Sequence, residues 1–353
     1  MLRTIGLRCP PSLDGVEAAL VETDGRVVRR VGPARRLPHP PALRRDLRAA
    51  ADEPGPPPEA LGRRLLDRCA EAVRTLGEAA ELIGLADPAW PGEAPAPAVE
   101  AAALARRLGV PVAHGFGEAD VLRGGPGAPV APAGFGALLP GLPRPLVVLE
   151  FDGVIRMTWI GAAQETARDA LVSLEAGPAG GMVEDWCRRS FGEAYDPDGR
   201  LASSGTPDGA VLARLTALPW VNQPPPRRLD RRRFEAELTA AGAAELPLLD
   251  GAATLLLFSA AATAAAARLL PGSPLQWLVT GPGRHNAGLI RAVAGVLEQP
   301  VRVIDGLGID GDAFAAQAVA VLAARATYQL PLTFPGTTGT AVPLPGGRIE
   351  TPV

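Results

Sequence analysis

The sequence predicts an α/β protein of two similar domains, each built from a mixed β-sheet flanked by helices. Three observations lead to this expectation: the length of the chain, a strand–turn–strand pattern that occurs twice, and the alternating helix and strand signals after each copy. The chain has 353 residues, of which 47% are hydrophobic. One hydrophobic core stops growing at about 250–300 residues, so the length favours two cores.

The repeated pattern is the main indication of two related halves. An Asp-Gly pair between β-prone runs favours a tight hairpin turn, because glycine adopts positive φ at low cost. Two such stretches start about 145 residues apart, which indicates two similar halves; coincidence between two common hairpins is the alternative. The β-prone runs are 4–7, 16–21 and 26–28 around Asp24-Gly25, then 146–151 and 154–160 around Asp152-Gly153.

The domain boundary is expected in a segment dense in proline and glycine, residues 123–145. Such composition is typical of loops and of crossings between domains. We therefore expect an N-terminal domain at residues 1–140 and a C-terminal domain at 141–353, with the final helix and tail packing back on the first domain. The proline run and its arginines at 223–228 are expected to be extended and solvated. Hydrophobic periodicity predicts further helices at 60–76, 96–108, 183–191, 232–241, 252–270, 286–297 and 312–325, and strands at 111–113, 275–280 and 301–304.

Composition argues against several classes of protein. A net charge of −3 speaks against a nucleic-acid partner, which requires a basic excess. All basic residues are arginine, so no lysine can hold a phosphate. Cys9, Cys69 and Cys187 are widely spaced, which favours neither a disulfide framework nor a zinc site and fits a reducing cytoplasm.

The start of the chain is too polar for a secretory signal. The most apolar stretch, residues 255–270, is shorter than the roughly 20 residues of a membrane span, so we expect a buried helix and no membrane partner.

Three loops have the character of phosphate-binding loops. Short polar or glycine-rich loops after strands bind phosphates in α/β folds, because free backbone N–H groups converge there. One loop, residues 12–15, lies inside the first hairpin, and Asp152-Gly153 is its counterpart in the second half. The third, residues 280–286, contains Gly281 and Gly283 at a strand-to-helix junction. Together the loops predict nucleotide binding in a cleft between the domains.

Many short motifs, in order along nearly the whole chain, resemble the anhydro-N-acetylmuramic acid kinase family. Residues 12–17 resemble its S-L-D-G-[VI]-D loop, and Asp120 followed by 124–129 resembles its A-D-V…G-G-Q-G-A-P segment. Gly177-Pro178 with Trp186 is similar to D-T-G-P-G-N…D-x-W. Further matches are Tyr195-Asp196 with Gly199 and Gly205, the stretch 224–234, residues 281–286 and 307–310, and Thr338-Gly339.

The resemblance implies the two-domain actin-like ATPase (ribonuclease H-like) fold, with mixed sheets flanked by helices and an interdomain cleft. It also implies an ATP-dependent enzyme of peptidoglycan recycling, whose small-molecule partners are ATP and a sugar. Such an enzyme opens the 1,6-anhydro ring of anhydro-N-acetylmuramic acid with water and phosphorylates the freed 6-hydroxyl, giving N-acetylmuramate 6-phosphate. A carboxylate activates the water, while Mg²⁺ and backbone amides neutralise the γ-phosphoryl charge.

The family's site residues map onto positions of this chain. The catalytic Asp falls on Glu175, one methylene longer, and Asp120 is the retained sugar-binding residue. Asp14 is the candidate metal residue, holding Mg²⁺ through water. The candidate ATP- and phosphate-binding residues are Pro10, Pro11, Ser12, Leu13, Asp14, Gly15, Gly153, Gly281 and Gly283.

Several positions depart from the family pattern. Pro10 and Pro11 replace Gly-Thr in the first loop, which removes two backbone donors. In the second hairpin the family's N-x-G-G-x-A-N-x-T becomes residues 150–158, so that Asp152 replaces a glycine; we interpret Asp152 as a turn residue. Family positions for a His, an Arg and a Glu of the sugar site are lost at Ala86, Gly117 and Ala315.

These departures leave three hypotheses: an active kinase, a catalytically impaired homologue with a binding or regulatory role, and an enzyme of the same fold with another substrate. A working base at Glu175 and a solvated surface glutamate are equally open interpretations. His114 and His285 are expected to be structural or solvated, and Trp186 and Trp277 to be core residues. The sequence does not reveal the oligomeric state, and a homodimer is one option.

Overall fold

The computed structural model describes residues 1–10, 12–52, 58–86, 99–162, 170–179, 186, 196–227, 229 and 231–352. Pro11 and most of the helix expected at 183–191 lie outside the described residues. The described chain forms two compact units. Unit 1 comprises Met1–Leu142 and Ala313–Val353, and unit 2 comprises Pro143–Asp312.

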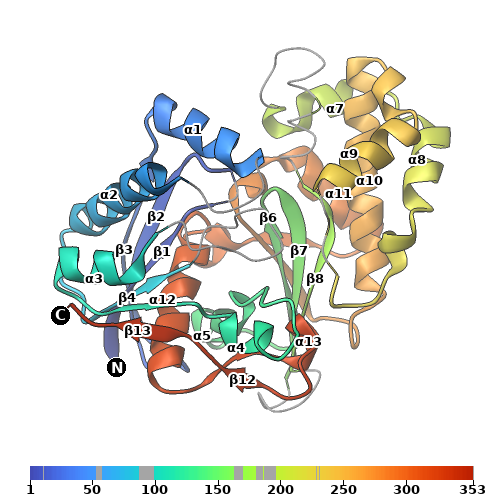
Figure 1. Ribbon diagram of the computed structural model, residues 1–353. Helices are drawn as coiled ribbons and strands as arrows, with labels where there is room; N and C mark the ends of the chain where they lie inside the picture. Colours follow the sequence, from blue (N-terminus) through green and yellow to red (C-terminus); the bar gives the residue numbers. More distant parts are fainter. Residues whose placement is uncertain are drawn as a thin grey trace. The chain divides into compact units, whose positions relative to one another are not determined.

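Unit 1 is built on a mixed six-stranded sheet in the order β13-β5-β4-β1-β2-β3. β1 pairs antiparallel with β2, and β2 with β3, while β1, β4 and β5 run parallel. The final strand β13 pairs antiparallel with β5 at the other edge (Figure 1). The strands are β1 (Leu2–Arg8), β2 (Gly15–Thr23), β3 (Val28–Pro38), β4 (Leu82–Leu85), β5 (Val112–His114) and β13 (Arg348–Glu350).

Helices cover both faces of this sheet. Ile5 and Leu7 of β1 share a buried cluster with residues of α2 (Glu59–Thr75) and α3 (Ala101–Leu108). Gly6, which points to the opposite face, lies so close to α12 (Phe314–Thr327) that a Cβ would overlap the Ala316 carbonyl oxygen. The remaining elements are α1 (Pro41–Asp52), α4 (Glu118–Val121), α5 (Pro132–Leu138), α13 (Pro335–Thr338), β11 (Pro331–Thr333) and β12 (Leu344–Pro345).

Unit 2 repeats this sheet order with five strands, β10-β9-β6-β7-β8. β6, β7 and β8 are antiparallel neighbours, like β1, β2 and β3 in unit 1. β6, β9 and β10 run parallel, like β1, β4 and β5. The shared topology confirms the predicted mixed-sheet α/β class and favours two related halves over a coincidence of hairpins. The strands are β6 (Leu146–Phe151), β7 (Val154–Ile160), β8 (Leu171–Pro178), β9 (Gln276–Thr280) and β10 (Val301–Val303).

One face of the unit 2 sheet packs on α10 (Leu248–Ala267) and α11 (Ala287–Leu297), shown in Figure 1. Val147, Leu149 and Phe151 of β6 belong to the buried cluster on that face. Because side chains alternate along a strand, Glu150 points to the opposite face. The other helices are α7 (Arg200–Ser204), α8 (Gly209–Thr216) and α9 (Arg231–Ala240), with 3-10 turns η1 (Pro197–Gly199), η2 (Pro219–Asn222), η3 (Ala243–Glu245), η4 (Pro282–His285) and η5 (Ile304–Leu307).

The long apolar helix α10 begins and ends earlier than the expected range 252–270, and it has 20 residues. By length and composition alone it is long enough to cross a membrane, but 61% of its most apolar window is buried inside the structure. It packs against β8, α7, α8 and α11. The structure therefore places α10 in the core of unit 2.

Candidate functional site

The first phosphate-type loop joins β1 to β2 in unit 1. The Leu13 N–H donates to the Pro10 carbonyl oxygen at 2.9 Å, and Leu13 has a positive φ of 50°. This conformation is uncommon for residues other than glycine. Pro10 contributes no N–H donor, so the described donors of this loop come from Ser12 onward. Gly15 is required by packing, since a Cβ there would lie 2.7 Å from the Leu37 carbonyl oxygen of β3.

Asp14, the candidate metal residue, is tied to the neighbouring strand. Its Oδ2 accepts from the Arg36 guanidinium at 2.6 Å, and its carbonyl oxygen accepts from the His39 N–H at 2.8 Å. Burial raises the pKa of the Asp14 carboxyl, but the hydrogen bond and charge of Arg36, with smaller contributions from Ser12 and Arg44, lower it overall. Oδ1 is buried and has no hydrogen-bond partner among the described residues.

Magnesium fits this loop only in part. No group of three or more His, Cys, Asp or Glu side chains with the geometry to hold a metal occurs among the described residues. Mg²⁺ in kinases keeps several waters and needs only one or two carboxylates besides the substrate phosphates. The orphaned Oδ1 of Asp14 meets that requirement, whereas Oδ2 is already held by Arg36.

The candidate phosphate residues of unit 2 gather at one end of its sheet. Gly153 lies in the turn between β6 and β7, and Gly281 follows β9, which runs parallel to β6. Gly281 has φ +83°, and a Cβ there would lie 2.7 Å from the Phe151 carbonyl oxygen; at Gly283 a Cβ would lie 2.8 Å from the Phe151 Cβ. Both glycines therefore allow the loop after β9 to close on the end of β6. At Gly153 the space is open.

Glu175, the candidate base, belongs to a row of side chains that crosses the same end of the sheet. In the strand registers Glu175 of β8 lies opposite Arg156 of β7, Arg156 opposite Glu150 of β6, and Glu150 opposite Thr280 of β9. Directly opposed residues of neighbouring strands share a face. The row thus connects the candidate base with Thr280, the first residue of the loop at 280–286 that contains Gly281 and Gly283.

The carboxylate of Glu175 is held by two groups. Its Oε2 accepts from the Leu229 N–H at 2.5 Å, and its Oε1 lies 3.4 Å from the Arg156 guanidinium. Arg156 also lies 3.7 Å from Glu150 Oε2. Glu175 is therefore a partly buried, ion-paired carboxylate.

Arg227 anchors the backbone beside Glu175 and is the exception to the expectation that residues 223–228 are solvated, since Gln223, Pro224 and Pro226 are exposed. The side chain is buried, with 5% exposure for the residue. Its guanidinium donates to the carbonyl oxygens of Glu175 at 2.8 Å and Ala176 at 3.2 Å, and to those of Trp220 and Val221 at 2.9 and 2.7 Å. Burial lowers the pKa of Arg227 to about 10, partly offset by the charge of Glu175. With the Gln223 carbonyl oxygen at 3.3 Å, five acceptors surround the guanidinium, and a composition argument does not reveal them because they come from two separate segments.

Asp120, the candidate sugar-binding residue, is buried in unit 1, with 1% of its surface exposed. Its carboxylate accepts from the Thr338 hydroxyl at 2.7 Å and from the Gly127 N–H at 2.8 Å. The carboxylate also fills the space in which a Cβ of Gly125 would lie. Asp120 therefore fixes the conformation of the loop at 124–129 and ties it to α13.

Sequence reasoning missed Arg284, which braces the second glycine loop. Its guanidinium donates to both oxygens of Asp305, at 2.7 and 3.1 Å, and to Asp312 Oδ1 at 2.6 Å. The loop was identified by its glycines, and Arg284 within it had no visible partner because Asp305 and Asp312 are about 20 to 30 residues away. As expected, Trp186 and Trp277 are core residues, and His114 has a structural contact, with Nε2 3.3 Å from Glu350 Oε1.

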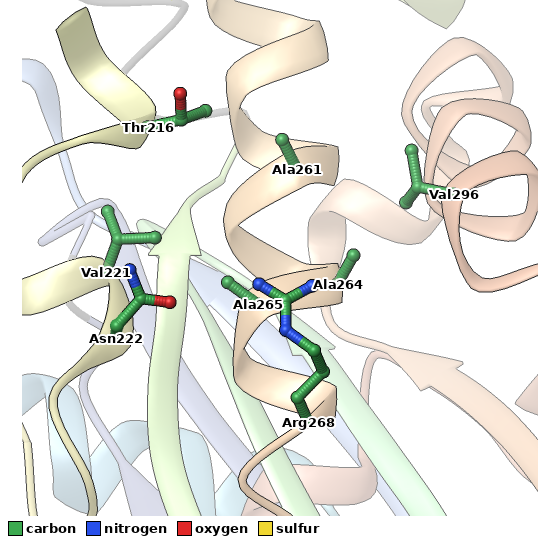
Figure 2. Close-up of a pocket in the computed structure, with 8 residues that line it drawn as sticks. All are labelled: Thr216, Val221, Asn222, Ala261, Ala264, Ala265, Arg268 and Val296. Atoms are coloured by element: carbon green, nitrogen blue, oxygen red, sulfur yellow. The ribbon is translucent and has the colours of Figure 1, made fainter. Parts of the chain in front are cut away.

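A pocket of about 310 Å³ lies elsewhere in unit 2 and contains none of the candidate site residues. Figure 2 shows its lining: three alanines of α10 face it together with Arg268, and η2, α8 and α11 supply the remaining side chains. No polar side chain that lines it is fully buried. This pocket is therefore separate from the row formed by Glu175, Arg156, Glu150 and Thr280.

Two units with the same sheet order, and loops after corresponding strands, define a two-domain α/β protein with a repeated mixed sheet. The family model for anhydro-N-acetylmuramic acid kinase matches residues 98–350. The anhydro-N-acetylmuramic acid kinase of Acidiphilium cryptum is 41% identical over 367 residues, which cover 99% of each chain. That of Rhodospirillum rubrum is also 41% identical and covers 97% of this chain and 92% of its own. The chain belongs to the anhydro-N-acetylmuramic acid kinase family.

Solved structures align at much lower identity. Component A of the (R)-2-hydroxyglutaryl-CoA dehydratase of Acidaminococcus fermentans is 11% identical, with a TM-score of 0.49 and coverage of 92% of this chain and 98% of its own. A ROK family glucokinase from Streptomyces griseus is 14% identical, with a TM-score of 0.44 and coverage of 92% and 99%. Family membership confirms the resemblance and the expectation of a sugar kinase, an ATP-dependent phosphotransferase.

Proposed function

We propose that this chain opens the 1,6-anhydro ring of anhydro-N-acetylmuramic acid and transfers the γ-phosphoryl group of ATP to the freed 6-oxygen. The products are N-acetylmuramate 6-phosphate and ADP. The observation that supports this most strongly is the 41% identity to a curated kinase of that name along 99% of both chains. A carboxylate at position 175, at the same end of the sheet as the glycine loops, agrees with it.

Glu175 is our candidate for the base. A water molecule attacks the anomeric carbon, the bond from that carbon to the 6-oxygen breaks, and the water's proton passes to a carboxylate. Leu229 and Arg227 fix the carboxylate and its backbone, as a positioned base requires. The extra methylene relative to Asp changes the reach of the side chain, and this matters because misplacement by about 1 Å can cost about 100-fold in rate.

ATP and Mg²⁺ are the proposed cofactors. Backbone groups of Ser12 to Gly15 in unit 1, and of Gly153, Gly281 and Gly283 in unit 2, are the proposed phosphate contacts, and Mg²⁺ supplies positive charge to the phosphates when bound. Asp14 Oδ1 is the proposed carboxylate contact of the metal, directly or through water. Pro10 and Pro11 stay in the proposed set by sequence position, although a proline supplies no N–H donor. Asp120 would act on the sugar through the loop that it holds.

A catalytically impaired homologue with a binding or regulatory role is the second candidate. Two observations favour it: Pro10 lacks a donor in the phosphate loop, and Arg156 occupies one oxygen of the proposed base. A binding protein of this kind would keep ligand affinity without turnover. The two candidates therefore differ in product formation.

The deciding experiment incubates the pure protein with ATP, Mg²⁺ and anhydro-N-acetylmuramic acid and measures N-acetylmuramate 6-phosphate by mass spectrometry. We expect product, together with a rise in melting temperature on adding ATP and Mg²⁺. Binding without product would favour the impaired homologue. If the protein neither binds ATP nor forms product, both the kinase and an ATP-binding relative are excluded.

Two further expectations concern the setting of the reaction. We expect the protein in the cytoplasm, where ATP is supplied, and fractionation of cells tests this. Light scattering on the purified protein gives its mass directly and distinguishes a homodimer from a monomer.

A further inference from the structure

The inference concerns Arg156, which lies between two carboxylates in the row that contains the proposed base. Its guanidinium is 3.4 Å from Glu175 Oε1 and 3.7 Å from Glu150 Oε2. Direct charge-assisted hydrogen bonds of this kind are about 2.7–2.9 Å long. The cation is thus shared by Glu150 and Glu175 and bound tightly by neither. Its Nε is buried and has no hydrogen-bond partner among the described residues.

The backbone around Arg156 favours such a shared position. The register between β7 and β8 shifts between Ile155 and Arg156. Irregularities of this type redirect a side chain and are frequent beside active sites. On the neighbouring pair of positions, Thr158 and Ser173 form an ordinary hydroxyl hydrogen bond of 3.0 Å across the same strands. The loose contact is therefore specific to the Arg156 position.

The surroundings of Glu175 differ on its two oxygens. Oε2 is fixed by the Leu229 N–H at 2.5 Å, whereas Oε1 has the shared Arg156 cation as its partner among the described residues. Among the described residues, the other charged groups in reach are Glu150 on β6, Asp152 in the turn, and Arg227, which binds the backbone of β8. Burial lowers the pKa of Arg156, but the charges of Glu150, Glu175 and Asp152 outweigh it and raise the pKa overall, so this side chain stays charged.

We propose that Arg156 is the positioning residue for Glu175 and that Glu150 sets the strength of this contact by competing for the same guanidinium. This inference rests on the proposed function for its kinetic consequence. When Arg156 leans toward Glu150, Oε1 of Glu175 is free to take a proton from water. When it leans toward Glu175, it holds the carboxylate in its working orientation, so loss of the guanidinium leaves the base unpositioned.

The kinetic arm of the test uses Arg156→Gln and Arg156→Lys, with Arg233→Gln as a matched control. Arg233 pairs with Glu237 at 2.9 Å on the exposed side of α9. We expect Arg156→Gln to lower kcat at least 10-fold while KM for ATP and for the sugar changes less than threefold. Arg156→Lys should restore kcat to within about threefold of the natural protein, and Arg233→Gln should match it. Equal losses in both Arg156 variants, a kcat within twofold of the natural protein in Arg156→Gln, or an effect on KM alone would overturn the proposal.

The second arm does not depend on activity and follows the amide of Leu229 by NMR in leucine-labelled protein, assigned by its loss in Leu229→Ile. Arg156→Gln frees the carboxylate to accept more strongly from this N–H, so its proton resonance should move downfield. Glu150→Gln gives Arg156 wholly to Glu175, so the resonance should move upfield. Arg233→Gln should move it in neither direction. Absence of opposite shifts would refute the positioning role even if the protein makes product, and opposite shifts in a protein without product would uphold it while the proposed function fails.

Discussion

Arg284 shows how single residues support the candidate site. Its side chain is 3% exposed and reaches Asp305 and Asp312, which are 43% and 55% exposed. It also donates to the Gly281 carbonyl oxygen at 3.2 Å, so it stabilises the conformation of the loop after β9. Hydrogen bonds to charged groups contribute about 1.5–3 kcal/mol each, and the half-exposed carboxylates reduce this by screening. The ion pairs of Arg284 with Asp305 and Asp312 therefore stabilise the fold to a moderate extent.

We predict that Arg284→Met lowers the free energy of unfolding by about 2–3 kcal/mol at pH 6. The hydrogen bond to Arg284 is the main cause that lowers the pKa values of Asp305 and Asp312 below their ordinary value. Groups with a lowered pKa in the folded state stabilise above the unfolded pKa, about 3.9 for Asp, and lose that contribution as the pH falls through the folded value. The difference between the natural protein and the variant should therefore shrink between pH 5 and pH 3.

Urea unfolding at several pH values measures this difference, and Arg291→Met, an exposed position on α11, is the control. A difference that stays constant from pH 6 to pH 3 would show that Arg284 acts through packing and not through its two carboxylates.

At the scale of elements, glycine has a different role in the β6–β7 turn, at Gly153, from its role in the loop after β9, at Gly281. Gly281 has positive φ and no room for a Cβ, because Phe151 lies against it. Gly153 has open space and no positive φ. A side chain at Gly281 therefore disturbs the fold, whereas one at Gly153 meets only what binds there.

We predict that Gly281→Ala lowers the free energy of unfolding by roughly 1–3 kcal/mol, and that Gly153→Ala changes it by less than about 1 kcal/mol. If phosphates approach the β6–β7 turn as proposed, Gly153→Ala should still weaken ATP binding at least threefold. Thermal unfolding and calorimetric titration with ATP and Mg²⁺ measure the two quantities. Unchanged ATP affinity in Gly153→Ala would remove this turn from the proposed phosphate site.

The same scale shows what the sequence can predict. The hairpin of β6 and β7 was expected at 146–151 and 154–160 and is found at Leu146–Phe151 and Val154–Ile160, since an Asp-Gly turn and a buried strand leave clear local signals. Strand β8 was not recognised as a strand, although it carries Glu175. The start of α10 was placed late because this helix is apolar on all sides, so periodicity does not mark its ends.

At the scale of the whole molecule, family and fold were within reach of the sequence, while the partners of the site residues were not. The order of short motifs identified the family. Two similar halves were expected from two Asp-Gly hairpins, but Asp24-Gly25 joins β2 to β3, whereas Asp152-Gly153 joins β6 to β7, the counterparts of β1 and β2. The row of Glu150, Arg156 and Glu175 depends on the register of three strands, which a shift between Ile155 and Arg156 alters. The burial of Arg227 depends on carbonyl groups from two separate segments. Such contacts are set by tertiary structure and have no local signature.

The central claim is that a carboxylate at position 175 acts as the base of a sugar kinase. The most direct measurement is the rate of N-acetylmuramate 6-phosphate formation by the natural protein, Glu175→Gln and Glu175→Asp, followed by mass spectrometry. A positioned general base contributes about 100- to 10,000-fold. We predict product with the natural protein, a loss of at least 100-fold in Glu175→Gln, and measurable turnover in Glu175→Asp, which restores the residue of the family pattern. Product formed at the same rate by Glu175→Gln would contradict the claim.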